Sequence, residues 1–565
     1  MTYKKKKFIS LLTALLMSAL FVTACQNSGG GSPTTEATTT VQNTTTAQST
    51  TAPTTSASAV NATDSSWGYT SDDFELMPIT TEPITLRYWC GPPSYTNVAP
   101  TRMDQPCFQV LEAVSGVTLV FETGEFGVMV ASGDYPDLIK MDWTRMPDGA
   151  SKYIEQGVIM DLKPHLEEYA PNFLKAMQRD EEIRIQNTTD EGYVVMFGMQ
   201  GITHFGLQVR KDWCDALGIE LPQTIDEWHN MLLSFKNDDP NGNGEADEIP
   251  LANYYAGYNT LKYFTGAFKT YEGSNSNPFY NDEGTIKFGP LTDNYKQWIT
   301  EMAKWYAEGL IDPDYLVNGT EQCDANMLSE KIGAIGENTK RVQGKYLDMM
   351  KNSNPDFTLV SVLTPMYTDG QHYFTGDVYH KNKTYRGTAI SAKTKYLEAA
   401  MRYCDWAYSD EGILFWNYGL ENISYTMENG KPVYTDEIMK NPNGWSIDEA
   451  QVYWRLIYDD LMGIETEDSV LDGYIWPQQL ELVANTKKEN NDLILPALYF
   501  TSDESMQIGS KWADINTFRN EQVNAFIMGQ RPISEYDSFV DELKRMGIED
   551  LVGIYQDAYD RYLVR

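Results

Sequence analysis

The chain has 565 residues, of which 42% are hydrophobic and 12% aromatic, and its formal net charge is −36. This length exceeds what one hydrophobic core usually holds, so two or more domains or lobes are expected. The negative charge argues against nucleic acid and anionic membrane surfaces as partners, because both repel an acidic surface, but it does not restrict a neutral ligand.

The first residues predict a secretion signal. Lys4 to Lys7 are basic, and Phe8 to Val22 form an apolar segment too short to span a bilayer. The sequence Val22-Thr23-Ala24-Cys25 then resembles a lipoprotein cleavage site. An ordinary secretory signal beside a chance cysteine is the alternative. The combination favours a signal peptide over residues 1–24 and lipidation of Cys25, which would anchor the chain on the outer face of a cell membrane.

Residues 25–66 are predicted to form a tether between the lipidated Cys25 and a folded body. They are rich in Ser and Thr and contain almost no large apolar side chain. Such a segment cannot bury enough surface to fold. Its length suits a Gram-positive cell envelope.

Strand and helix patterns alternate after the tether. Residues 84–90 and 115–121 are rich in β-forming side chains, with a helical stretch over 103–114 between them. A third strand is expected over 134–143, and residues 205–213 read as a strand that runs into a helix. Further helices are expected at 292–309, 396–408, 448–462 and 534–564. The alternation predicts an α/β fold.

An acidic loop follows a predicted helix at residues 225–235, which Thr224 and Glu227 begin as a capping box. The loop resembles half of an EF-hand, but its twelfth position is Pro250 instead of glutamate. Calcium prefers six to eight oxygen ligands. The loop offers these in Asp239, Asn241, Asn243, Glu245 (through its carbonyl), Asp247 and Glu248. A single structural calcium is predicted; the alternative is a solvated Asn-Gly turn.

The cysteines predict neither a disulfide framework nor a zinc site. Apart from Cys25, five are scattered without a CxxC pair: Cys90, Cys107, Cys214, Cys323 and Cys404. Isolated cysteines among apolar neighbours usually act as small buried hydrophobic residues.

Enzyme signatures are mostly absent from the sequence. It contains no GxSxG, HExxH or P-loop motif, and its five histidines do not stand at ligand spacing: His165, His204, His229, His372 and His380. With 80 acidic residues, a catalytic pair of carboxylates could always be chosen, so no such choice is informative. We therefore predict no catalytic residues.

Aromatic side chains are the candidate ligand contacts, because sugar rings stack their C–H faces on Trp and Tyr. Trp89 and Trp143 stand at the predicted carboxyl ends of strands, where open α/β sheets bind ligands. The other candidates lie after the acidic loop or in loops with Gly, Asn and Pro: Tyr254, Tyr255, Trp445 and Trp476. For each of them, packing in the core or on the surface is the alternative.

Several segments together resemble the extracellular solute-binding proteins of family 1, the sugar-binding lipoproteins of ABC importers, and among them the alginate-binding and LipO-like subgroup. They are SGDYPDLIKMDW (132–143), YIEQGVIMDLKPHLEEYAPNF (153–173), FGLQVRKDWCDALGIELPQTIDEW (205–228), ISAKTKYLEAAMRYCDWAYSDEGILFWNYGLEN (390–422), LPALYFTSDES (495–505) and the tail over 526–562. The resemblance extends from about residue 80 to the end of the sequence.

This resemblance implies a two-lobe periplasmic-binding-protein-like α/β fold, with a ligand cleft between the lobes and extra C-terminal helices. The first lobe is expected to comprise residues 67–200 and 365–420. The second lobe, with the C-terminal helices, would comprise 201–364 and 421–565. The family also implies a structural calcium in the acidic loop, hinge closure around an oligosaccharide, and delivery by a monomer to ABC-importer permease subunits.

Three other functions remain open on the sequence. A surface glycoside hydrolase would place two carboxylates about 5 to 9 Å apart and would turn its glycan over. A binding protein for peptides or other polar solutes would share the fold. A structural adhesin is the least favoured, because the alternation of strands and helices argues against it.

Overall fold

The computed structural model describes residues 66–93, 96–146, 148–257, 259–273, 277–376, 386–459 and 461–565. These belong to one compact unit, Val60–Arg565. The predicted signal peptide, the lipidation site Cys25 and the predicted tether up to residue 65 lie outside the described residues. No helix within the described ranges is both long and apolar enough to cross a membrane.

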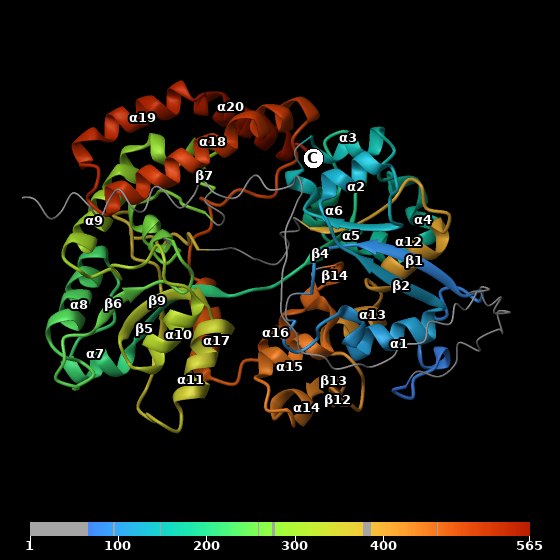
Figure 1. Cartoon of the computed structure of the whole chain (residues 1–565), viewed down its shortest axis with the longest axis horizontal. Helices are drawn as coiled ribbons and strands as arrows, with labels where there is room; N and C mark the ends of the chain where they lie inside the picture. The colour runs from blue at the N-terminus through green and yellow to red at the C-terminus, as the bar shows by residue number, and fades with distance from the viewer. Residues whose placement is uncertain are drawn as a thin grey trace, which may run out of the picture. The chain divides into compact units, whose positions relative to one another are not determined.

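Six strands form the larger sheet (Figure 1). Their order is β14 (Gly463–Ile464), β4 (Phe197–Gln200), β11 (Gly387–Ile390), β3 (Leu138–Met141), β1 (Ile84–Trp89) and β2 (Val117–Glu122). The strand β1 pairs in parallel with β2 and β3, whereas β11 runs antiparallel to β3 and β4. We call this sheet and the elements packed around it the first lobe.

Four strands form the second sheet, which defines the second lobe. Their order is β10 (Leu359–Val362), β5 (Phe205–Arg210), β9 (Ile332–Asn338) and β6 (Ile249–Ala252). All residues of β5 and β9 are buried, as expected for central strands that are covered on both faces. Two hairpins, β7–β8 (Phe279–Asp282, Thr285–Phe288) and β12–β13 (Tyr425–Glu428, Lys431–Tyr434), stand apart from the two sheets.

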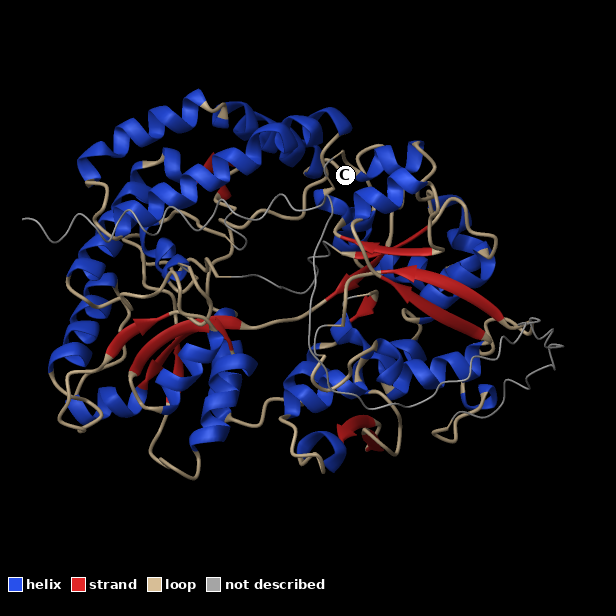
Figure 2. Cartoon of the chain, viewed as in Figure 1, coloured by secondary structure: helices blue, strands red, loops and turns tan. Residues whose placement is uncertain are grey.

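Helices flank both sheets (Figure 2). Those of the first lobe are α1 (Pro106–Ser115), α2 (Phe126–Ser132), α3 (Ala150–Glu155), α4 (Leu166–Tyr169), α5 (Pro171–Arg179), α6 (Glu181–Asn187), α12 (Leu397–Trp406), α13 (Asp410–Tyr418), α14 (Asp436–Met439) and α15 (Ile447–Trp454). Those of the second are α7 (Lys211–Leu217), α8 (Ile225–Asn237), α9 (Asp293–Ala307), α10 (Thr320–Leu328), α11 (Lys345–Met350) and α17 (Pro477–Thr486). The short α16 (Glu467–Leu471) follows β14.

Three C-terminal helices, α18 (Ser502–Ile527), α19 (Tyr536–Arg545) and α20 (Ile548–Tyr562), pack on the second lobe, and α18 and α20 also contact the first lobe (Figure 1). Their apolar faces belong to the second core, which includes Val523 and Leu551. Their other end is held by the first lobe, where the Arg561 and Arg565 guanidinium groups both contact the Asp190 carboxylate, at 2.6 and 3.0 Å. The C-terminal helices therefore form a connection between the two lobes.

The predicted strands and most predicted helices are confirmed, with shifts of a few residues at their ends. The capping box of α8 is present, because the Thr224 hydroxyl accepts from the Glu227 amide and the Glu227 carboxylate accepts from the Thr224 amide. The helix predicted over 534–564 is two helices, separated at Gly547, whose φ of 89° an L-residue rarely adopts. The helix predicted over 448–462 ends at Trp454.

The division between the lobes differs from the predicted one in two places. The strand β14 pairs with β4 in the first sheet, and Tyr425 and Ala450 lie in the first core, although residues 421–565 were expected in the second lobe. Conversely, Phe374 lies in the second core, although the first lobe was expected to resume at residue 365. Local patterns do not reveal which sheet a segment joins, because that depends on long-range strand pairing.

Candidate functional site

The acidic loop folds around its own oxygens. The Asp239 carboxylate accepts from the backbone amides of Asn243 and Gly244, at 3.1 and 3.0 Å. The Asn243 side-chain amide donates to the Asp247 carboxylate at 3.1 Å. Asp239 has φ of 47°, in a left-handed region that Asn and Asp tolerate better than most residues. These hydrogen bonds therefore hold the side chains of three predicted ligands, Asp239, Asn243 and Asp247, within one turn.

Two carboxylates of this loop differ in their electrostatics. The Lys331 ammonium, 2.9 Å from the Asp247 carboxylate, lowers the pKa of Asp247, with a further contribution from Asn243. Burial raises the pKa of Glu248, and the negative charges of Asp247 and Asp239 raise it further. The Glu248 Oε1 atom is buried and has no hydrogen-bond partner among the described residues. A cation between these carboxylates would relieve their repulsion and satisfy that oxygen.

The loop fits calcium better than a transition metal. Within the described residues, no three His, Cys, Asp or Glu side chains are gathered closely enough to hold a metal ion. A site here therefore needs the amide oxygens of Asn241 and Asn243 and the carbonyl of Glu245 in addition to carboxylates. Such an all-oxygen set is typical of Ca²⁺.

Two of the six predicted ligand contacts lie together in the core of the first lobe. Trp89 is 9% exposed and Trp143 is 0% exposed, and both pack edge-on against Phe126. The Trp143 indole nitrogen also donates to the Gly387 carbonyl. Trp143 therefore serves packing in this structure and presents no face to a ligand.

Three other predicted contacts lie together in the second lobe. Tyr254 is buried, and its ring contacts that of Tyr255, which is 38% exposed and whose hydroxyl accepts from Arg341 at 2.8 Å. Trp476 packs against the same hydrophobic cluster, and its buried indole nitrogen has no partner among the described residues. The sixth, Trp445, lies apart beside Tyr453 in the first lobe.

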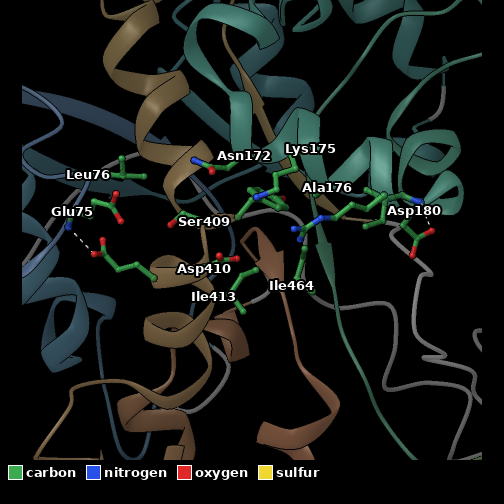
Figure 3. A pocket seen from close by; sticks show the side chains of 14 residues that line it. Glu75, Leu76, Asn172, Lys175, Ala176, Asp180, Ser409, Asp410, Ile413 and Ile464 are labelled. Atoms are coloured by element: carbon green, nitrogen blue, oxygen red, sulfur yellow. Dashed lines mark hydrogen bonds between the residues drawn. The ribbon is translucent and has the colours of Figure 1, made fainter. Parts of the chain in front are cut away.

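A pocket of about 280 Å³ opens on the first lobe, between α5, α6 and α13 (Figure 3). Its polar lining comprises Glu75, Asn172, Lys175, Arg179, Asp180, Tyr408, Ser409, Asp410 and Glu411. Because both signs of charge line it, the pocket favours neither anions nor cations. None of the six predicted aromatic contacts lines it, and no sequence pattern indicates it.

No sequence pattern indicated a cluster of side chains that lies between the end of β9 and α15. Lys340 meets Gln451, Tyr458 and Tyr474 there, although these three follow it by more than 100 positions. The aromatic and basic side chains were visible in the sequence, but nothing in their spacing indicates that they meet.

The family model of the bacterial extracellular solute-binding proteins matches residues 108–413, which is more than half of the chain. The chain belongs to this family. Its members are substrate-binding proteins and not enzymes, which agrees with the predicted family and the absence of a predicted catalytic site.

Two curated relatives match most of the chain. The fructooligosaccharide ABC transporter substrate-binding protein FusA of Streptococcus pneumoniae serotype 4 is 25% identical over 475 residues, covering 77% of this chain and 81% of FusA. Lipoprotein LipO of Bacillus subtilis is 23% identical over 480 residues, covering 80% of this chain and 89% of LipO.

Solved structures share the fold. The alginate-binding protein AlgQ2 without calcium ion superimposes with a TM-score of 0.69 at 20% identity, covering 85% of this chain and 99% of AlgQ2. The FusA EF-hand mutant in complex with fructo-nystose gives 0.68 at 20% identity, covering 85% of this chain and 100% of that chain. The predicted two-lobe, periplasmic-binding-protein-like α/β fold is thus confirmed.

Proposed function

We propose that this family member captures an oligosaccharide outside the cell and delivers it to the permease of an ABC importer. The observation that carries this proposal is the similarity to FusA over 77% of the chain. Lipidation at Cys25 would keep the protein at the membrane, as the name of lipoprotein LipO supports. We propose that the protein acts as a monomer.

A neutral glycan suits the charge of this chain best. The net charge of −36 repels polyuronates over long range unless basic side chains line the site. Lys340 contacts protein side chains, and Arg341 donates to Tyr255. The name of FusA, which specifies fructooligosaccharides, also points to a neutral ligand.

The ligand would lie between the lobes, and we propose the aromatic group of the second lobe as its stacking surface. Tyr255 offers an exposed ring, and Trp476 packs against the hydrophobic cluster that contains Tyr254. The Tyr254 ring packs edge-on against the Tyr255 ring. Trp89 and Trp445 are weaker candidates, because Trp89 is 9% exposed and Trp445 lies apart from the group.

We also propose that the acidic loop binds one structural calcium. The unsatisfied Glu248 oxygen and the gathered oxygens of Asp239 and Asn243 support it. The names of the AlgQ2 structure without calcium and of the FusA EF-hand mutant agree with a calcium loop in such proteins.

A binding screen tests the proposed function. We expect neutral oligosaccharides to raise the melting temperature of the full-length protein, because a ligand that binds only the folded state stabilises it by mass action. Uronate oligosaccharides and peptides are run beside them, and chromatography checks that the bound sugar is recovered intact. A shift with peptides alone would refute the oligosaccharide proposal and keep the fold.

Substitution Tyr255→Ala is expected to weaken binding of the sugar found in this screen by about tenfold, which corresponds to about 1.4 kcal/mol, because a stacking face is lost. Isothermal titration calorimetry measures the change. Tyr396→Ala is the matched control, since Tyr396 is 40% exposed but lies in the first lobe before α12. Equal losses in both variants would contradict the assignment of Tyr255.

A further inference from the structure

Lys340 makes a contact between the two lobes. It is the second residue after β9 of the second sheet. Its ammonium donates to the Tyr458 hydroxyl at 2.6 Å and to the Gln451 amide oxygen at 2.9 Å. Gln451 lies on α15, in the first lobe, and Tyr458 follows that helix. Figure 1 shows β9 and α15 as separate elements of the two lobes. A rotation of one lobe against the other would make or break this contact.

The partners of Lys340 are neutral. Lys340 forms no ion pair with any described residue, and its other contacts are the rings of Tyr458 and Tyr474, at 5.2 and 5.9 Å. The nearby acidic groups already have partners: Asp448 accepts from Tyr458, and Glu465 pairs with the buried Arg455. A buried cation without a counter-ion is unfavourable, and hydrogen bonds to neutral groups offset this only in part.

The charged surroundings add to this cost. Burial lowers the pKa of Lys340 to about 8, and the positive charge of Arg455 lowers it further, whereas Asp448 and Glu465 oppose the shift. Tyr458, Tyr474 and Gln451 are the uncharged groups that face the ammonium, and His204 contacts the Tyr474 hydroxyl behind it. The Lys340 side chain is partly buried, and two hydrogen bonds and two aromatic rings surround its ammonium.

The ion pairs at Asp190, which connect the C-terminal end to the first lobe, join opposite charges, unlike the Lys340 contact. There, two guanidinium groups meet a carboxylate, and Arg561 also pairs with Glu504 at 2.6 Å. Opposite charges with several hydrogen bonds favour a lasting connection. The Lys340 contact lacks such a charge partner and is therefore suited to open and close.

We propose that Lys340 is a positioning residue that keeps the contact between the lobes weak and reversible, because its ammonium is buried against neutral acceptors when the lobes meet and is hydrated when they part. This inference rests on the proposed function, since release of a captured ligand requires the lobes to separate. Lys340 would thus oppose closure and favour release.

The sign of the pH effect follows from linkage. With the contact formed, Lys340 has a pKa of about 8, whereas a hydrated lysine has a pKa of about 10.4. Between these values the contact state binds fewer protons, so raising the pH favours contact. The closure equilibrium constant is expected to rise by up to about tenfold per pH unit from pH 8 to 10.

The experiment measures the distance between the lobes without ligand, so its result does not depend on whether the protein binds a sugar. Spin labels are placed on Val128→Cys in the first lobe and Val317→Cys in the second, at residues that are 69% and 76% exposed. Cys25→Ser prevents labelling at that position, and the five other cysteines are buried. Pulsed electron paramagnetic resonance then reports the distance distribution of the full-length protein.

Lys340→Met is expected to raise the closure equilibrium constant about tenfold at pH 7 and to remove its dependence on pH between 8 and 10. The Lys340→Arg protein keeps its charge, so its lobes are expected to remain apart at both pH 8 and pH 10. Lys345→Met is the control, because Lys345 pairs with Asp324 within the second lobe, and it should behave as the unchanged protein. A smaller closed fraction in Lys340→Met, or a distance independent of pH in the unchanged protein, would overturn the proposal.

Discussion

Substitution Glu272→Ala is expected to lower the free energy of unfolding by about 3–5 kcal/mol. Glu272 and Arg519 form an ion pair in which both side chains are 0% exposed, and both Glu272 oxygens accept from the Arg519 Nη1 atom, at 2.7 and 2.6 Å. The Tyr295 hydroxyl also donates to Glu272. Removal of the carboxylate leaves a buried guanidinium without its counter-ion, which is far more costly than loss of an exposed pair.

Chemical denaturation measures this loss. Because Arg519 lies on α18 and Glu272 precedes β7, the pair fastens the C-terminal helices to the second lobe. The exposed pair Lys511–Asp550 supplies a control, and Asp550→Ala should change the free energy of unfolding by less than about 1 kcal/mol. The double substitution Glu272→Met with Arg519→Met should be much less destabilising than Glu272→Ala. If Glu272→Ala cost no more than Asp550→Ala, the pair would not be a major source of stability.

Removal of calcium is expected to lower the free energy of unfolding by about 3–4 kcal/mol when calcium was present at 100 to 1,000 times its dissociation constant. The physical reason is the return of repulsion among Asp239, Asp247 and Glu248, together with the unsatisfied Glu248 oxygen. Thermal unfolding with and without EDTA measures the loss. Calcium should restore stability, whereas the same concentration of magnesium should not, because Mg²⁺ demands a tighter octahedral site.

The variant Asp239→Asn isolates the loop. Asparagine tolerates the left-handed backbone at this position, so the substitution removes charge while retaining the turn. We expect it to abolish most of the sensitivity to EDTA. The neighbouring Asp238→Asn, outside the proposed ligand set, should keep it. If the Asp239→Asn protein and the unchanged protein were equally sensitive to EDTA, the loop would be a polar turn and not a calcium site.

Local sequence signals predicted much of the secondary structure. β1, α8 and α9 follow from alternation, a capping box and helical spacing, which act over a few residues. The longest helix among the described residues, α18, is not one of the helices expected from the sequence pattern, although Thr501 and Glu504 form a capping box at its start. Only six of its 26 residues are buried, so its apolar pattern is weak.

Only part of the candidate site could be predicted from the sequence. The acidic loop lies within one stretch of sequence, so its oxygens could be identified together, and hydrogen bonds in the structure link several of these residues. Trp143 could not be told apart from Tyr255, because whether an aromatic ring is buried depends on elements distant in sequence. Phe126 and Gly387 cover the Trp143 indole, while Tyr255 remains exposed.

The sequence by itself determined the family, the alternation of strands and helices, and the loop that offers calcium ligands, because each depends on residues close together in the chain. Only the tertiary structure decided that β14 joins the first sheet, that the C-terminal helices bridge both lobes, and that Lys340 meets Gln451 and Tyr458. Those contacts join residues separated by more than 100 positions. The free energy of such contacts depends on burial and charge in three dimensions, which no local pattern encodes.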